Sequence, residues 1–370
     1  MKILTKGNLE DYIAGATILG CGGGGNVEDA RVFIEDAFKK GLEFKLADIN
    51  ELPDEALLCI LAFVGGGVSK EVSDQVAPYF QKLNRKKKKM TNVLQKASRR
   101  LSDFIGKEFE SYIAAETGPL NGIVPMYTAA LEGKPCIDGD CCGRAKPEIA
   151  ISLTNVAGIP TTPLCIVTPF DETLILESAV DDYRAEDLSR YAAVASGGRA
   201  YVARCPAKVE LYKKGMVPKQ VTKCIRIGEA VRIARGKGGN PVAPFIEETS
   251  AEKLFEGTVS SHDVEGRGGF NWGNWYVKGH DEFWGHSFRV WFKNEHLISW
   301  LDGEPCAVCP DLICIVDAKT GEGLSNFVES GEHNGKNVVI FRLRAHKAWK
   351  TKKGLELFGP AHFGHDMEYK

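Results

Sequence analysis

The sequence predicts a mixed α/β fold in two domains: an N-terminal α/β domain over residues 1–168 and a β-rich C-terminal domain over residues 169–370. The chain has 370 residues, and at roughly 150 residues per domain this length favours two domains. In the first half, segments with helical periodicity alternate with short apolar runs. Between residues 253 and 343, short β-type runs are separated by Gly, Asp and Asn turns.

The helices and strands are expected from apolar spacing and from helix caps. Residues 8–19 have apolar side chains near helical spacing, and the glycine run after them ends that helix. Asn26 can cap a second helix over 27–39. Residues 57–64 form an apolar run typical of a buried strand. The remaining expected elements are helical structure over 69–113, a helix over 121–132, strands over 135–138 and 163–168, a helix over 220–234, and strands over 288–292 and 312–316.

Charge and composition exclude some classes of protein. The 47 Lys and Arg residues nearly balance the 49 Asp and Glu residues, which disfavours a protein that coats nucleic acid or an anionic membrane. The segment 82–100 is strongly basic, but it contains no aromatic residue for stacking on bases. A solvated helix face or a mobile loop is therefore favoured over nucleic-acid binding.

Targeting and cysteine signals point to the cytoplasm. No apolar run approaches the ~18 residues that span a bilayer, and the first residues do not resemble a signal peptide. The 11 cysteines are an odd number, which favours reduced thiols over a disulfide framework. We expect a cytoplasmic protein that forms a homo-oligomer and does not associate with membranes.

The glycine run matches the pattern GxGxxG at Gly20, Gly22 and Gly25. A dinucleotide-binding site needs a strand before these glycines, whereas a helix is expected there, and this disfavours such a site. The backbone N–H groups of Gly22, Gly23 and Gly24 can instead point at an anionic ligand. A tight turn that only glycine fits explains the run equally well.

The densest polar cluster spans residues 138–148 and follows an expected strand. Asp138 and Asp140 project to the same side if that strand continues. One carboxylate could orient a water or a metal while the other holds Arg144, and Glu148 adds a third carboxylate. A network that only ties the loop down is the alternative.

Other residues are expected to contribute to this site or to a metal centre. Glu116 and Asn121 lie on the preceding loop and could reach the same place. Cys141 and Cys142 are either reactive thiols or, more often for cysteine, small buried residues.

Candidate ligands for a divalent metal, zinc or manganese, are Asp138, Asp140 and His280, the last because carboxylates flank it. His280 and His286 lack the i, i+4 spacing of a zincin helix. Cys306 and Cys309 resemble half of a zinc ribbon whose second half is absent.

Together these motifs resemble the S-methyl thiohydantoin desulfurase family, whose members are often encoded beside, or fused to, hydantoinase/oxoprolinase proteins. The resemblance rests on Ile18–Gly25, Ile137–Asp140, Gly143–Ala145, Pro147–Glu148, Lys293–Glu295, Pro310–Ile313, Thr320–Glu322 and Gly354–Gly364. The chain departs from the family pattern at Cys21, at Cys141 and Cys142, and in the basic segment.

The resemblance implies hydrolytic removal of sulfur from a thiohydantoin, or of methanethiol from its S-methyl form. Asp138, Asp140 and Glu148 would then activate water, and Arg144 with the glycine amides would stabilise charge. Gly22, Gly23, Gly24, Glu116 and Asn121 are the expected substrate contacts. A ring-opening cyclic amidase and a non-catalytic partner of a hydantoinase/oxoprolinase subunit are the alternatives.

Overall fold

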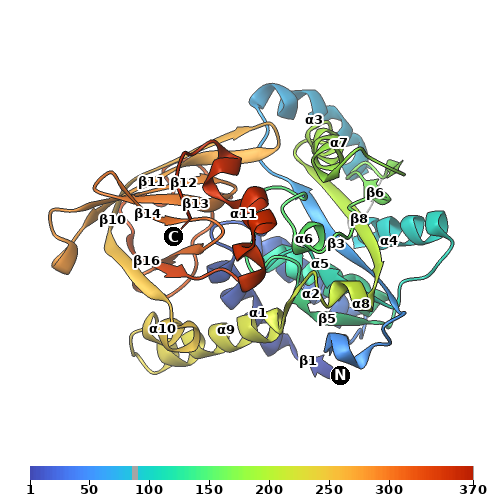
Figure 1. Cartoon of the computed structure of the whole chain (residues 1–370), viewed down its shortest axis with the longest axis horizontal. Helices are drawn as coiled ribbons and strands as arrows, with labels where there is room; N and C mark the ends of the chain where they lie inside the picture. Colours follow the sequence, from blue (N-terminus) through green and yellow to red (C-terminus); the bar gives the residue numbers. More distant parts are fainter. Residues whose placement is uncertain (86–90, 370) are drawn as a thin grey trace.

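The computed structural model describes residues 1–85 and 91–369 and contains two β-sheets (Figure 1). The first sheet has the order β1-β2-β5-β4-β3-β8-β6-β7, and β9 pairs with β5. Its strands are β1 (Lys2–Leu4), β2 (Phe44–Ala47), β3 (Leu57–Gly65), β4 (Ser111–Ala114), β5 (Pro135–Asp140), β6 (Leu164–Val167), β7 (Thr173–Leu176), β8 (Arg199–Lys208) and β9 (Val217–Pro218). Strands β2, β5, β4 and β3 are parallel, so their carboxyl ends meet at one edge of the sheet, where α/β proteins place ligands.

The second sheet is antiparallel and curled, with the order β14-β13-β12-β11-β10-β16-β15. Its strands are β10 (Glu252–Arg267), β11 (Phe270–Gly279), β12 (Ser287–Lys293), β13 (Glu295–Leu301), β14 (Glu304–Val308), β15 (Leu312–Asp317) and β16 (Asn337–Leu343). The mixed α/β class with a β-rich C-terminal region is therefore confirmed. Strands β7, β8 and β9 follow residue 168 in the chain and pair within the first sheet.

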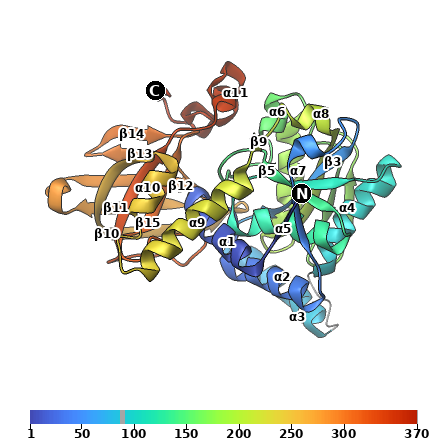
Figure 2. The ribbon, with the colours of Figure 1, turned by 90° about the horizontal axis from the view of Figure 1, so that it is seen from below.

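The helices gather around the first sheet and at its junction with the second (Figures 1 and 2). They are α1 (Lys6–Leu19), α2 (Val27–Lys39), α3 (Lys70–Arg85), α4 (Thr91–Ile105), α5 (Pro119–Leu131), α6 (Leu153–Val156), α7 (Asp182–Val194), α8 (Val209–Tyr212), α9 (Gln220–Gly236), α10 (Ala243–Thr249) and α11 (Lys352–Phe358). Among the described residues, no helix combines the length and the apolar character needed to cross a bilayer.

The prediction of helical structure over 69–113 was wrong for the residues after Ile105. Gly106 adopts a left-handed φ of 68° and ends α4, and the chain then enters the buried strand β4. Part of the basic segment, residues 86–90, lies outside the described residues. On α4, Leu94 and Leu101 are buried, whereas Arg100 is exposed and lies 3.7 Å from Asp103.

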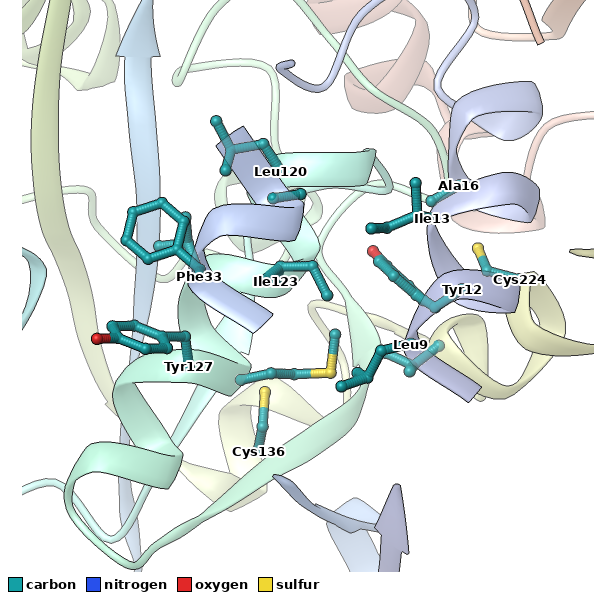
Figure 3. Close-up of a cluster of buried hydrophobic side chains, with 14 of the residues drawn as sticks. Leu9, Tyr12, Ile13, Ala16, Phe33, Leu120, Ile123, Tyr127, Cys136 and Cys224 are labelled. Atoms are coloured by element: carbon teal, nitrogen blue, oxygen red, sulfur yellow. The ribbon is translucent and has the colours of Figure 1, made fainter. Parts of the chain in front are cut away.

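Helix α1 holds the two halves of the chain together. A Cβ atom on Gly15 would lie 2.0 Å from the backbone oxygen of Cys224 on α9, and one on Gly228 would lie 1.9 Å from that of Asp11. Because both positions are glycine, the two helix backbones can touch. The other side of α1 packs on α2 and α5 through an apolar cluster that includes Tyr12 and Ile123 (Figure 3).

Candidate functional site

A cavity of about 390 Å³ lies where the carboxyl ends of β3 and β4 meet the β12–β13 hairpin of the second sheet. Its walls combine glycine backbone, aromatic rings and ionisable groups. The lining includes Gly24, Gly25, Asn26, Phe63, Gly65, Gly66, Phe80, Glu116, Leu120, Asn121, Lys146, Glu148, Ile149, Arg190, Arg199, Tyr201, Arg204, Asn294, Glu295 and Phe327.

Glu116 lies two residues beyond the end of β4 and is buried. Asn121 Nδ2 donates a hydrogen bond to Glu116 Oε1 at 2.6 Å, and the Lys146 backbone N–H donates to Oε2 at 3.0 Å. Burial raises the pKa of Glu116, while the charge of Lys146 and these two donors oppose the rise. Both donors favour the ionised carboxylate, which is the form a general base requires.

Two buried cations lie on the same cavity. Burial, and then the charge of Arg204, lowers the pKa of Lys146, whose ammonium donates to the Glu148 carbonyl oxygen at 2.9 Å. Arg204 on β8 is fully buried and donates through Nη1 to Cys205 Sγ at 3.2 Å. Arg204 Nε and Nη2 have no partner within the described part of the chain. A buried guanidinium with free donors can bind negative charge strongly, because burial weakens competition from water.

Glu295 reaches the cavity from the second sheet. It follows Asn294, which turns the β12–β13 hairpin at a left-handed φ of 60°, a conformation that asparagine tolerates better than most residues. Glu295 Oε2 is buried and has no partner within the described chain. Burial, and then the charge of Glu116, raises the pKa of Glu295 well above its ordinary value. Burial therefore favours the protonated form of this carboxyl.

Glu148 lies at the cavity wall in an ion-paired cluster. Lys293 Nζ lies 2.5 Å from Glu148 Oε1, and His362 Nε2 lies 2.9 Å from Oε2. Burial works against ionisation, but the His362 hydrogen bond and the Lys293 charge outweigh it and lower the pKa of Glu148 to about 2. The cluster ties the loop after β5 to β12 and to the C-terminal segment.

Three predicted catalytic residues lie outside the cavity lining. Asp138 accepts hydrogen bonds from Thr222 N at 2.9 Å and from Thr222 Oγ1 at 2.6 Å, so it caps the start of α9. Asp140 accepts hydrogen bonds from the backbone N–H groups of Cys142 and Gly143 and from the Thr117 hydroxyl. Burial raises the pKa of Asp140 to about 6.

Arg144 is the third of these residues, and it joins the two domains. It is buried, and its guanidinium donates to the backbone oxygens of Asp311 at 2.5 Å and His296 at 2.6 Å. Both acceptors belong to the second half of the chain. The observed contacts of Asp138, Asp140 and Arg144 are those of residues that hold segments together.

Residues of α5 and of the second sheet lie close against the backbone of the glycine run. The Gly24 carbonyl oxygen accepts hydrogen bonds from the N–H groups of Leu120 and Asn121, both at 3.1 Å, and so caps α5. A Cβ atom on Gly23 would lie 1.8 Å from Glu295 Oε1. Gly24 lines the main cavity, whereas Gly22 and Gly23 line a smaller cavity of about 150 Å³ beside it.

The structure thus brings Glu148, Glu116, Asn121 and Gly24 together. The sequence patterns did not single out Lys146, Arg204 or Glu295. Lys146 nevertheless lies in the polar cluster 138–148, and Glu295 lies in the motif Lys293–Glu295. Arg204 had a weaker signal, since it is a charged residue within the apolar strand segment Tyr201–Cys205.

The metal candidate His280 and the thiols of Cys141 and Cys142 lie outside the cavity lining. Among the described residues, Glu256, His280 and Asp281 form the one group of three or more His, Cys, Asp or Glu side chains close enough to share a metal ion. Lys253 Nζ already lies 2.6 Å from Glu256 Oε2 and places a positive charge there. Cys141 and Cys142 are buried, which raises their thiol pKa well above the ordinary value and disfavours the nucleophilic thiolate.

Comparison with known proteins identifies the family. The models of the S-Me-THD-like N-terminal and C-terminal domains match residues 7–178 and 180–370. The chain belongs to the S-Me-THD-like family, as its motifs predicted.

A crystal structure of a protein from Chromobacterium violaceum, a structural genomics target, has the same fold. The match covers 100% of this chain and 99% of that chain, with a TM-score of 0.79 and 20% sequence identity. None of the curated proteins matches this chain.

Proposed function

We propose that the protein hydrolyses the C–S bond of an S-methyl thiohydantoin and leaves a hydantoin and methanethiol; an unmethylated thiohydantoin would release sulfide. The observation that carries this proposal is that Arg204 and Glu295, two of the three buried groups on this cavity that have no partner within the described chain, are charged or acidic; the Tyr201 hydroxyl is the third. Family membership supports the substrate class. The cavity supports hydrolysis, because it combines a candidate base, a candidate acid and a free cation.

Glu116 and Glu295 have environments that separate their roles. Glu116 accepts two hydrogen bonds that favour its carboxylate, so it takes a proton from water as that water attacks the carbon bearing sulfur. Glu295, whose neutral form is favoured by burial, gives a proton to the departing sulfur. Burial raises the pKa of both carboxyl groups, but the two hydrogen bonds to Glu116 oppose the rise there, and we therefore assign the base to Glu116 and the acid to Glu295. In the S-methyl form, Glu116 passes the proton that it took to the ring nitrogen. As the C–S bond breaks and the water oxygen becomes the new carbonyl oxygen, the remaining hydroxyl proton returns to Glu295, so that both carboxyl groups regain their starting states.

Arg204 and Lys146 stabilise the negative charge that develops during this addition. One preorganised donor of this kind contributes roughly 2.7–4 kcal/mol to lowering a barrier. The Nε and Nη2 groups of Arg204 have no partner within the described chain, so they are the donors that we assign to a ring oxygen, nitrogen or sulfur. In this proposal, Asp138, Asp140 and Arg144 support the site by holding the surrounding segments.

The product identifies the reaction. Purified protein is incubated with S-methyl thiohydantoin, thiohydantoin and hydantoin, with and without zinc or manganese, and the released thiol and the ring products are measured. Methanethiol with intact hydantoin is expected. A ring-opened carbamoyl product would instead indicate a cyclic amidase, and activity that requires an added hydantoinase subunit would indicate a partner protein.

Two variants test the assignment of roles. Glu116→Gln and Glu295→Gln are each expected to lower kcat by about 10²–10⁴-fold, the usual contribution of a positioned acid or base. Glu304→Gln, a change at an exposed glutamate of β14, is the matched control and should retain full activity. Full turnover in both cavity variants would refute the roles.

A further inference from the structure

We infer that the ring of the natural substrate carries an uncharged apolar substituent, preferably aromatic, which lies between the reacting groups and the mouth of the cavity. This inference rests on the proposed function and names its substrate class more closely. It follows from the volume of the cavity, from its lining near the mouth, and from the pairing of the charges there.

The cavity is larger than the ring that reacts in it. Its volume of about 390 Å³ is in the range of pockets that bury whole drug-sized ligands, about 300–1,000 Å³. A five-membered ring with its exocyclic atoms leaves room in such a pocket for a substituent.

The lining differs between the two faces of the first sheet, because successive side chains of a strand point to opposite faces. On the face of Arg204, which is fully buried, the ionisable groups gather. Toward the mouth, the Phe63 and Tyr201 rings pack with centroids 4.6 Å apart. Phe80 of α3 also lines the cavity and contacts Phe170, with ring centroids 4.9 Å apart. At the mouth the side chain of Arg199 is 38% exposed. The outer part of the cavity therefore presents aromatic surface.

The charges at the outer end are already paired. Arg199 Nη2 lies 2.9 Å from Asp29 Oδ2. Arg190 Nε lies 2.8 Å from Glu186 Oε1, and its remaining nitrogens donate to the carbonyl oxygens of Gly65, Gly269 and Pro147. A carboxylate on the substituent would compete with these partners. An apolar group instead gains from burial against the rings, where a phenyl group removes a large apolar area from water.

Binding of the product hydantoins tests this preference without depending on turnover. Calorimetric titration compares 5-benzylhydantoin, unsubstituted hydantoin and 5-carboxymethylhydantoin. We expect the benzyl compound to bind at least tenfold more tightly than either of the others. Equal or tighter binding of the carboxymethyl or the unsubstituted compound, or no binding of the benzyl compound, would overturn the inference.

A substitution of Phe80 tests where in the cavity the ring substituent lies. Phe80→Ala is expected to reduce the benzyl-to-unsubstituted affinity ratio at least threefold, whereas Phe104→Ala, at an exposed phenylalanine outside the cavity lining, should leave the ratio unchanged. An unchanged ratio in Phe80→Ala would contradict the placement. If none of the corresponding S-methyl thiohydantoins is hydrolysed, the proposed function fails, while the ranking of hydantoin affinities still decides the preference for a substituent.

Discussion

A substitution of Arg144 tests whether this residue is structural or catalytic, because the two roles predict opposite results for the same variant. In the structure its guanidinium donates to the backbone oxygens of Asp311 and His296 and so joins the loop after β5 to the second half of the chain. Arg144→Met keeps an unbranched apolar stem and removes the donors. We expect this variant to be destabilised and to remain active where it is folded.

The magnitude follows from these two hydrogen bonds. A buried acceptor left without its partner costs roughly 1–3 kcal/mol, and removal of a desolvated charge offsets part of that cost. A net loss of about 3 kcal/mol is therefore expected. At about 2.1 cal/mol/K per residue, the unfolding entropy of a 370-residue chain is about 0.8 kcal/mol/K, so the melting temperature should fall by about 4 °C.

Differential scanning calorimetry measures the melting temperature, and the thiol-release assay well below the transition measures activity. The control is Arg226→Met, since Arg226 is 66% exposed and forms a surface pair with Glu248, which is worth at most about 1 kcal/mol. An Arg144→Met variant that melts like wild type but has lost turnover would refute the structural role and restore Arg144 as a catalytic residue.

Three further predictions concern stability. Asp138→Ala removes the cap of α9 formed through Thr222 and should cost about 1–2 kcal/mol in urea unfolding; an unchanged midpoint would contradict the cap. Gly15→Ala places a Cβ atom 2.0 Å from a backbone oxygen of α9, whereas one on Gly7 would be 3.7 Å from its nearest neighbour outside the helix backbone, so only the former should lose soluble, folded protein on expression. The folded-state pKa of Glu148, about 2, lies below its ordinary value of 4.5, so the stability that its ionised form contributes is present above pH 4.5 and is lost as the pH falls toward 2. The difference in unfolding free energy between wild type and Glu148→Gln should therefore shrink over that interval. A constant difference would refute the ion-paired role.

The local elements could be predicted because their signals are local. The cap at Asn26, the apolar run of β3 and the glycine stop after α1 each act within a few residues, and all three appear in the structure. Strand β4 was missed because its four buried residues follow a long helical segment without a distinct pattern. The position of Gly106 marked the end of that segment.

The candidate site was predictable only in part because it forms across the chain. Glu116, Asn121, Glu148 and Gly24 come from segments around the parallel strands, and general knowledge of strand ends brings them together. Glu295 arrives from a hairpin of the second sheet, which spacing along the chain does not reveal. Asp138 was attractive as a carboxylate after a strand, but its hydrogen-bonding capacity is used by α9, and a sequence does not show which backbone N–H groups will face a carboxylate.

A crystal structure of the protein with a bound hydantoin tests the central claim most directly. The predicted result places the ring in the cavity between the two sheets, within hydrogen-bonding distance of the Arg204 guanidinium and the Glu295 carboxyl group. A ring bound beside Asp140, or beside His280 on the second sheet, with that cavity left to solvent, would contradict it.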